Sequence, residues 1–342
     1  MTLAVLGATG YTGRLVLDEA RRAGLPLRLV GRRREALEAL AEPGEEVRVA
    51  DARNEGALGA AFEGAAVVAS SAGPFLELGS APVAAAIAAG AHYLDTSGEQ
   101  KWVRLVHERF AAPAAERGVV VIPSFGFDYV PGDLAARLAA EQVEGALDEI
   151  VVAYSAKGVG TSRGTRRTMA ALMDQGQLAW QDGRLVPSRF GATTRTVRFP
   201  FGERTVVEWG GAEPVTVPRH TDVRNVRSYL RAPAVAAHTG RFGKLVAPLL
   251  RLSTLAGPEG PRETGRRKSR FIVVAEARGP GGSGRAVLSG SDPYGLTALL
   301  LVRGAQALIA GEARRAGVLA PAEAFDARAL AARLGPLLRV ES

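Results

Sequence analysis

The sequence predicts a two-domain α/β protein, in which a doubly wound parallel sheet is followed by a second, mixed or antiparallel α+β domain. Strand-like and helix-like segments alternate regularly over the first 122 residues. Strand-like runs then follow one another without regular helices, and a long apolar helix comes near the C-terminus. At 342 residues the chain also exceeds the usual size of one compact core, which favours two domains.

Six strand–helix repeats build the first domain. Ala-rich amphipathic stretches between the strands are long enough for helices. Parallel neighbours need such crossover connections, and their strands are buried on both faces. The predicted strands cover residues 3–6, 27–30, 47–49, 66–70, 92–94 and 119–122.

The second domain is predicted to begin where the alternation stops, and the C-terminal helix is predicted to return to the first domain. The helix over 291–317 is too apolar to stand alone in water, so it needs a partner surface. The segment "GPGGSG" is typical of a hairpin loop. The predicted strands of this domain are 148–156, 194–201, 204–209, 226–230 and 269–279. The predicted domain boundaries are 1–130, 131–290 and 291–342.

Composition excludes several classes of function. The chain has no cysteine, which excludes disulfides, thiolate catalysis and cysteine-ligated metals. Its four histidines are dispersed, so we predict no metal site. The net charge is +8, but the arginines are scattered and no nucleic-acid-binding motif appears, so we expect no nucleic-acid partner. Without a basic apolar leader or a long uncharged apolar run, we expect no transmembrane segment and a cytoplasmic location.

A glycine-rich stretch between the first strand and the first helix is the clearest binding motif. Gly7 would permit a tight turn, Gly10 a close approach of backbone to phosphate, and Gly13 close packing of helix on strand. The helix N-terminus would add amide donors and a positive dipole. The predicted dinucleotide-binding residues here are Gly7, Ala8, Thr9, Gly10, Tyr11, Thr12 and Gly13.

The end of the second strand predicts NADP(H) rather than NAD. An NAD site usually has an acid there for the ribose 2′-hydroxyl, whereas this chain has Arg32 and Arg33, which suit a 2′-phosphate. The alternative is a solvated arginine run that opens a helix. Asp51, after the third strand, is placed to meet the adenine edge. The residues that would border the nicotinamide half follow the fourth strand and are Ser71, Ala72 and Gly73.

Four segments of the chain resemble the saccharopine dehydrogenase-like oxidoreductases. They are "GATGYTGR" at 7–14, "SSAGPF" at 70–75, "AGAHYLDTSGE" at 89–99 and "GFDYVPGDL" at 126–134. In the last segment Tyr129 replaces the usual Ser. The glycines alone would also fit NmrA-like proteins, but the four segments together are specific.

The resemblance implies an NADP-binding Rossmann domain, a mixed-sheet second domain and a C-terminal return. Its trans-acting enoyl reductase branch is the preferred analogy, so we expect an NADP(H)-dependent oxidoreductase that transfers hydride to an enoyl or imine-like, small-molecule or lipid-linked substrate. The alternatives are a saccharopine-type amino-acid dehydrogenase and a non-catalytic NADP(H)-sensing or scaffold protein. Exposed sheet edges in the second domain would suit a homodimer.

Polar residues near the predicted sheet edge are candidates for the chemistry. Asp128 could relay a proton and Tyr129 could donate to a developing oxyanion, although Asp128 and Asp133 could instead cap the helix that begins near 132.

Further along the chain, "GTSRG" at 160–164 fits a hydrolase elbow formally, but "KGVGT" separates it from its strand, which argues against a hydrolase. Its residues could instead cap a helix or hold an anionic substrate. The candidate substrate residues are Ser162, Arg163, Thr165 and Tyr294.

Overall fold

The computed structural model describes residues 1–162, 166, 176–231 and 260–341, and it divides the chain into two compact units. Unit 1 comprises Met1–Ser97, Lys101–Phe127 and Tyr294–Leu319. Unit 2 takes the rest, so the chain crosses between the units several times. The predicted fold class is confirmed, because unit 1 holds a parallel sheet and unit 2 a mixed one.

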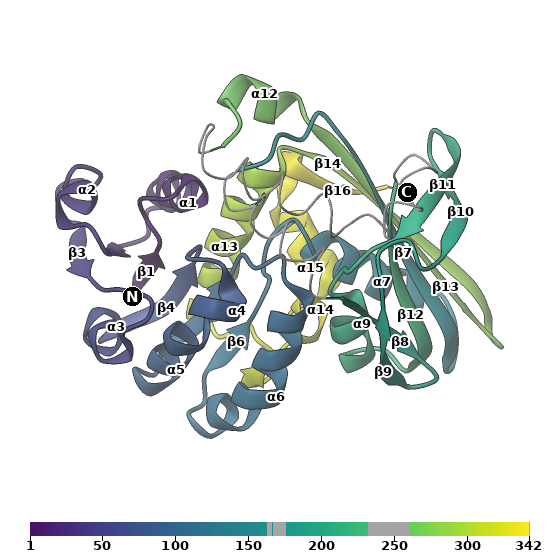
Figure 1. Cartoon of the computed structure of the whole chain (residues 1–342), viewed down its shortest axis with the longest axis horizontal. Coiled ribbons are helices and arrows are strands. Elements are labelled where there is room, and N and C mark those ends of the chain that lie inside the picture. The colour runs from purple at the N-terminus through teal and green to yellow at the C-terminus, as the bar shows by residue number, and fades with distance from the viewer. Residues whose placement is uncertain (163–165, 167–175, 232–259, 342) are drawn as a thin grey trace. The chain divides into compact units, whose positions relative to one another are not determined.

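The sheet of unit 1 is parallel throughout and has the strand order β15-β6-β5-β4-β1-β2-β3. Figure 1 labels β1, β3, β4 and β6 of this sheet. The order reverses at β1, which pairs with β4 on one side and β2 on the other. In open α/β sheets this switch point is where ligands bind, outside the carboxyl ends of the strands. The strands are β1 (Thr2–Leu6), β2 (Leu27–Gly31), β3 (Glu46–Val49), β4 (Ala65–Ser70), β5 (His92–Asp95), β6 (Val120–Ile122) and β15 (Gly317–Val318).

Helices pack on this sheet through buried apolar side chains. In α1, Val16, Leu17 and Ala20 are buried at helical spacing. The helices α3, α5 and α6 share one hydrophobic core with the strands, and that core includes Phe62 and Trp102. The helices are α1 (Tyr11–Arg22), α2 (Arg34–Glu38), α3 (Glu55–Phe62), α4 (Phe75–Leu78), α5 (Ser80–Ala88), α6 (Gln100–Glu116) and α13 (Pro293–Ile309).

The C-terminal segment is divided between the units, which corrects the prediction that 291–342 packs as one piece on the first domain. The helix α13 and the short strand β15 belong to unit 1, where β15 pairs with β6. From Ala320 onward the chain belongs to unit 2. There Leu338, which is buried, pairs with Gly290 of the mixed sheet, so the last strand completes that sheet instead.

The nine-stranded sheet of unit 2 is mixed because β7 and β12 are parallel, whereas its other described pairs are antiparallel. The predicted strands appear with small shifts at their ends, and the predicted "GPGGSG" loop is the hairpin that joins β13 and β14. Four strands were not predicted: β8, β9, β14 and β16. The strands are β7 (Leu147–Lys157), β8 (Gln177–Gln181), β9 (Arg184–Ser188), β10 (Thr194–Phe199), β11 (Gly202–Glu208), β12 (Val223–Leu230), β13 (Arg270–Gly279), β14 (Gly282–Ser291) and β16 (Leu338–Val340).

Helix α7 is the main helix of unit 2 and packs on β7, β13 and β14. Nearly all of its residues are buried, including Pro131, Gly132 and Asp133. A second core lies among the strands and includes Phe199 and Tyr229. The described helical segments are α7 (Val130–Ala140), α9 (Glu213–Thr216), η1 (Val217–Arg219), α12 (Glu263–Lys268), α14 (Pro321–Ala324), α15 (Ala327–Arg333) and η2 (Gly335–Leu337).

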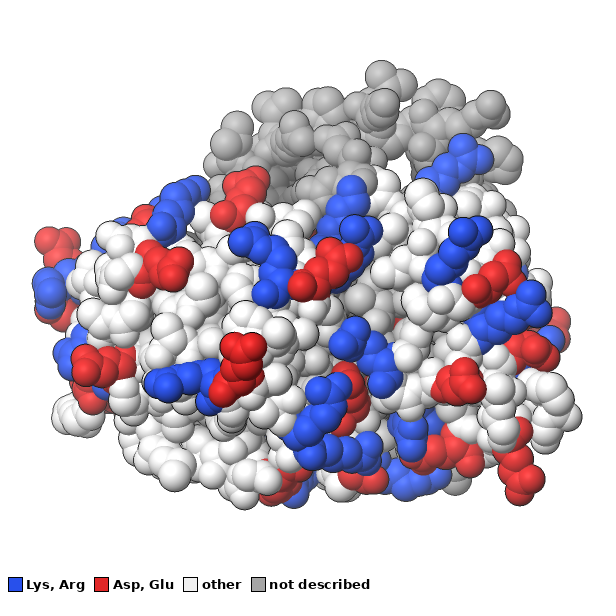
Figure 2. Space-filling model, turned by 90° about the horizontal axis from the view of Figure 1, so that it is seen from below, with Lys and Arg blue, Asp and Glu red and all other residues white. Residues whose placement is uncertain are grey.

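On the face of the molecule that Figure 2 draws, the basic side chains are not collected in one block. Figure 2 shows basic and acidic side chains interspersed on one face of the molecule. Many arginines are also paired, as Arg104 is with Glu108 and Arg224 with Asp182. Across the described part of the chain, every helix is too short or too polar to span a bilayer.

Candidate functional site

The glycine-rich stretch forms a tight turn between β1 and α1. Gly7 adopts a φ of +82°, and its N–H donates to the carbonyl of Val30 at 3.0 Å. The Gly10 N–H turns back to the carbonyl of Gly7 at 2.9 Å, and α1 begins at the next residue. A side chain on Gly7 would be strained by its φ and would lie 2.9 Å from the hydroxyl of Ser71.

Gly13 brings the first turn of α1 directly onto this loop. A Cβ at Gly13 would lie 2.2 Å from the carbonyl oxygen of Gly7 and 2.9 Å from Cα of Ala8. The first turn of α1 carries no acidic residue, so no carboxylate there neutralises the positive end of the helix dipole. The loop and helix therefore have the geometry that suits a pyrophosphate.

Backbone hydrogen bonds bring the other predicted dinucleotide-binding residues to the same sheet edge. The Ser71 N–H donates to the carbonyl of Leu6 at 2.9 Å, next to Gly7. On the other side of β1, the Ala50 N–H donates to Gly31 at 2.9 Å, so Asp51 lies beside the residues that follow β2. The parallel register thus gathers at one edge residues that are far apart in the sequence.

Arg32 and Arg33 follow β2 at this edge, and both are exposed. The next arginine, Arg34, is paired with Glu38 at 3.3 Å. Among the described residues, no carboxylate pairs with the side chains of Arg32 and Arg33. These two guanidinium groups are available for an anion, and the edge has no acid in the position that an NAD site uses.

Asp95, at the end of β5, organises the neighbouring part of the edge. It is fully buried, and its Oδ1 accepts the backbone N–H groups of Ser97 at 3.0 Å and Ser124 at 2.8 Å. Its Oδ2 accepts the indole N–H of Trp102 at 2.8 Å. Because three donors occupy this carboxylate, we assign Asp95 to holding the ends of β5 and β6 in place.

We expect Asp95→Asn to lower the free energy of unfolding by about 2 kcal/mol. Both oxygens of Asp95 accept hydrogen bonds, so the NH₂ group of the asparagine would face an N–H donor in either orientation of the amide. Urea denaturation would measure the loss. Trp102→Phe removes one of the donors, so in that background the same Asp95 substitution should cost less. Equal costs in both backgrounds would contradict this assignment.

The two candidate catalytic residues differ in their surroundings within unit 2. Tyr129 is buried, and its hydroxyl donates to the carbonyl of Gly98 at 2.7 Å. The carbonyl of Gly210 is a second, longer partner of the same hydroxyl at 3.3 Å. Its proton is therefore used in a hydrogen bond to the backbone, and its role as an oxyanion donor stays a prediction. Asp128 is exposed, and the protein packed around it raises the pKa of its carboxyl group above the ordinary value through partial desolvation. Neither Asp128 nor Asp133 caps α7, because the N-cap is Tyr129 and makes no side-chain cap.

A buried carboxyl group that was not predicted packs against α7. Glu213 is fully buried, and it accepts hydrogen bonds from the hydroxyls of Tyr154 at 2.5 Å and Ser228 at 2.6 Å. Gly132 and Gly211 leave the space it occupies, because a Cβ on either would lie 2.1 Å from its oxygens. Desolvation raises the pKa of Glu213 to about 7. A lone Glu at the start of a four-residue helix gave no sequence signal for this cluster.

The raised pKa of Glu213 predicts a pH-dependent stability. The folded chain holds this proton up to about pH 7, whereas the unfolded chain releases it near 4.5. The contribution to stability is therefore complete below pH 4.5 and is lost as the pH rises through 7. Urea denaturation at several pH values should show wild type losing up to about 1 kcal/mol per pH unit relative to Glu213→Gln. Parallel curves for the two proteins would contradict this assignment.

The predicted substrate residues do not come together as one described group. Ser162 is buried, and Arg163 and Thr165 lie outside the described residues. Tyr294 belongs to unit 1, where its ring packs edge-on against that of Tyr11. The structure therefore places Tyr294 beside the glycine loop.

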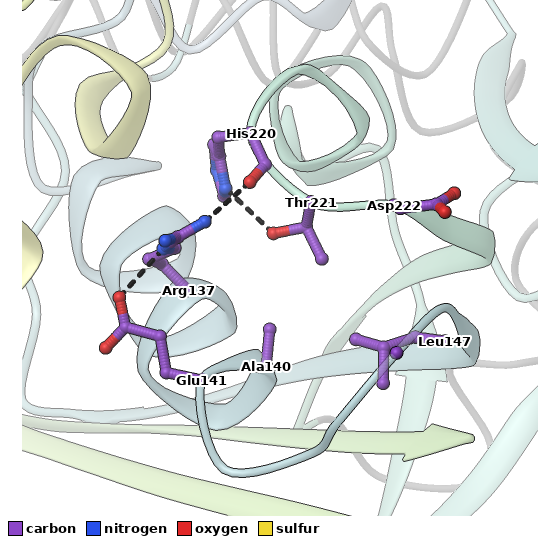
Figure 3. Close-up of a pocket in the computed structure, with 8 residues that line it drawn as sticks. Arg137, Ala140, Glu141, Leu147, His220, Thr221 and Asp222 are labelled. Carbon is purple, nitrogen blue, oxygen red and sulfur yellow. Dashed lines mark hydrogen bonds and ion pairs between the residues drawn. The ribbon is translucent and has the colours of Figure 1, made fainter. Parts of the chain in front are cut away.

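Unit 2 contains a pocket of about 210 Å³ at the C-terminal end of α7 (Figure 3). Arg137 donates to the carbonyl of His220 at 2.7 Å and to Glu141 at 2.8 Å. The ring of His220 lies 3.1 Å from buried Asp133, which also accepts the N–H of Ala322 at 2.8 Å. These contacts tie α7 to η1 and α14, so we assign this group to structure. In the portion that the structure describes, no cluster of three or more His, Asp or Glu side chains could hold a metal.

Comparison with protein families matches the first part of the chain to one family. Residues 7–93 match the NAD(P)H-binding family model, a range that covers the glycine loop, the strands β2 to β4 and the start of β5. This match indicates that residues 7–93 belong to a domain that binds a nicotinamide cofactor.

Comparison with individual proteins confirms the resemblance found in the motifs. A mouse saccharopine dehydrogenase-like oxidoreductase is 30% identical over 168 residues, which are 43% of this chain and 39% of that protein. A Mycobacterium tuberculosis protein named as a trans-acting enoyl reductase is 34% identical over 184 residues, 50% of this chain and 44% of that protein. The chain thus matches less than half the length of these relatives. The fold is that of yeast saccharopine dehydrogenase (L-Glu forming), with a TM-score of 0.64, 12% identity and 99% of each chain covered.

Proposed function

We propose that this chain, which is similar to the saccharopine dehydrogenase-like oxidoreductases over part of its length, is an NADPH-dependent oxidoreductase. The observation that carries the proposal is the edge of the first sheet. It combines a pyrophosphate-binding glycine loop with two exposed arginines where an NAD site has an acid. This combination distinguishes NADPH from NADH by the 2′-phosphate alone.

The residues of the edge have distinct tasks in this proposal. The loop from Gly7 to Gly13 holds the pyrophosphate, Arg32 and Arg33 hold the 2′-phosphate, and Ser71 borders the nicotinamide half. When bound, the cofactor supplies the hydride. Asp128 remains the candidate proton relay, since its exposed carboxyl group can exchange a proton with solvent and its pKa is raised toward neutral pH.

For the substrate we propose an enoyl or imine-like, small-molecule or lipid-linked compound. Support comes from the likeness to the M. tuberculosis protein, which is named as a trans-acting enoyl reductase. The fold match to saccharopine dehydrogenase favours the alternative of an amino-acid dehydrogenase, because that protein is named for saccharopine.

We propose a cytoplasmic location and a homodimer.

The test is to incubate the protein with NADPH and a panel of enoyl thioesters, imines and keto acids, and to follow NADPH oxidation by absorbance. We expect turnover with an enoyl or imine substrate, and a slower rate in Asp128→Asn with unchanged NADPH affinity. Turnover confined to keto acids with an amino acid would favour the amino-acid dehydrogenase. Tight NADPH binding without turnover of any substrate would favour a sensor or scaffold protein.

A further inference from the structure

An aromatic pair links the glycine loop to the C-terminal return within unit 1. Tyr11 is the first residue of α1, directly after Gly10. Tyr294 lies in the first turn of α13, and both residues belong to unit 1. Their ring centroids are 5.2 Å apart with the planes at 88°, which is the edge-to-face geometry that aromatic side chains favour. Both side chains are partly exposed.

The start of α13 is fixed to the segment that follows β6. The hydroxyl of Thr297, one turn after Tyr294, accepts the N–H of Phe127 at 3.1 Å. Gly126 lets the helix come close, because a Cβ there would lie 3.1 Å from Cγ2 of Thr297. Residues 126–127 follow β6, and β6 lies on the β4–β5–β6 side of β1, away from β2 and its arginines. Tyr294 therefore contacts the glycine loop through Tyr11, and the helix that it opens contacts the segment after β6 through Thr297.

We propose that Tyr294, together with Tyr11, forms an aromatic wall for the nicotinamide half of the bound dinucleotide. Aromatic faces and edges next to a planar heterocycle contribute to binding without reading its polar groups. NADPH and NADH share this half, so the wall acts on both cofactors equally, whereas the arginines act on the 2′-phosphate. This inference rests on the proposed dinucleotide function and assigns the C-terminal return to cofactor binding.

The test titrates wild type, Tyr294→Ala and Tyr294→Phe with NADPH, NADH and adenosine 2′,5′-bisphosphate by calorimetry. The last compound carries the adenine half and the 2′-phosphate but no nicotinamide. We expect Tyr294→Ala to weaken NADPH and NADH by about tenfold each, the size of one base–aromatic contact. The same variant should bind the bisphosphate like wild type. Tyr294→Phe keeps the ring and should stay within about twofold of wild type for all three.

Three results would overturn the inference. Unchanged NADPH binding in Tyr294→Ala would show that the ring makes no contribution, and equal losses for NADPH and the bisphosphate would show general damage to the edge. A loss in Tyr294→Phe as large as in Tyr294→Ala would exclude an aromatic wall. If wild type itself binds neither dinucleotide, the proposed function fails and this inference fails with it. Binding by wild type with no effect of Tyr294→Ala removes this inference alone.

Discussion

Gly13→Ala is expected to weaken NADPH and NADH alike by at least about 100-fold, or ~2.7 kcal/mol. The added methyl group would lie 2.2 Å from the carbonyl oxygen of Gly7 and 2.9 Å from Cα of Ala8, and both are backbone atoms that cannot rotate away. Helix α1 would have to move off the loop, so the amide groups at its N-terminus would no longer point at the pyrophosphate. Both cofactors share that pyrophosphate and should lose affinity together.

Gly59→Ala is the matched control for this substitution. Gly59 also lies in a helix of unit 1, α3, but a Cβ there would meet no atom within 4 Å. We expect the control to bind both cofactors like wild type and to be slightly more stable, because alanine favours helix over glycine. Calorimetric titration of both variants measures the difference. Retained binding in Gly13→Ala would contradict the assignment of the loop as the pyrophosphate site.

Replacing Arg32 and Arg33 together with alanine is expected to weaken NADPH by about 100-fold and to leave NADH within about twofold of wild type. A hydrogen bond to a charged group contributes roughly 1.5–3 kcal/mol, and exposure of both side chains places these two contacts at the low end. NADH has a hydroxyl where NADPH has the phosphate, so it gains little from the guanidinium groups.

Arg34→Ala provides the control for charge alone. Arg34 is the next residue in the chain and is exposed, but it already pairs with Glu38. Its loss should leave NADPH binding nearly unchanged, and any remaining effect should fade with added salt. Equal losses of NADPH and NADH in the double variant would contradict the specificity argument.

The arrangement of the glycine loop and of the arginines after β2 was predictable because local sequence determines it. The turn at Gly7, the helix that starts at Tyr11 and the arginines after β2 all depend on residues close together in the chain. Once the alternation of strands and helices indicates a parallel sheet, the carboxyl ends of β1 to β4 must meet at one edge. The structure places the predicted residues of unit 1 there.

The buried polar groups were not predictable because tertiary packing creates them. Nothing near Glu213 in the sequence indicates that Tyr154 and Ser228 will donate to it, or that two distant glycines will leave it space. In the same way, Gln100 bonds to the backbone of Leu178 and Gly211, far along the chain. The surroundings of Tyr129 were hidden for the same reason, since its hydroxyl meets backbone carbonyls that the sequence pattern does not reveal.

The C-terminal segment was only partly predictable, because its long apolar helix has a clear sequence pattern and its short strands do not. The apolar stretch in α13 predicts a buried helix, and that helix belongs to unit 1 as expected. The strands β15 and β16 have two and three residues, too few to show an alternating pattern. Their pairing with β6 and β14 places the last part of the chain in two different sheets.

The central claim is that the edge of the first sheet binds NADPH in preference to NADH, and calorimetric titration of wild type with both cofactors tests it most directly. We expect saturable one-to-one binding of NADPH that is at least about tenfold tighter than that of NADH, as the two arginines require. Equal affinities, tighter binding of NADH, or no binding of either cofactor would contradict the claim.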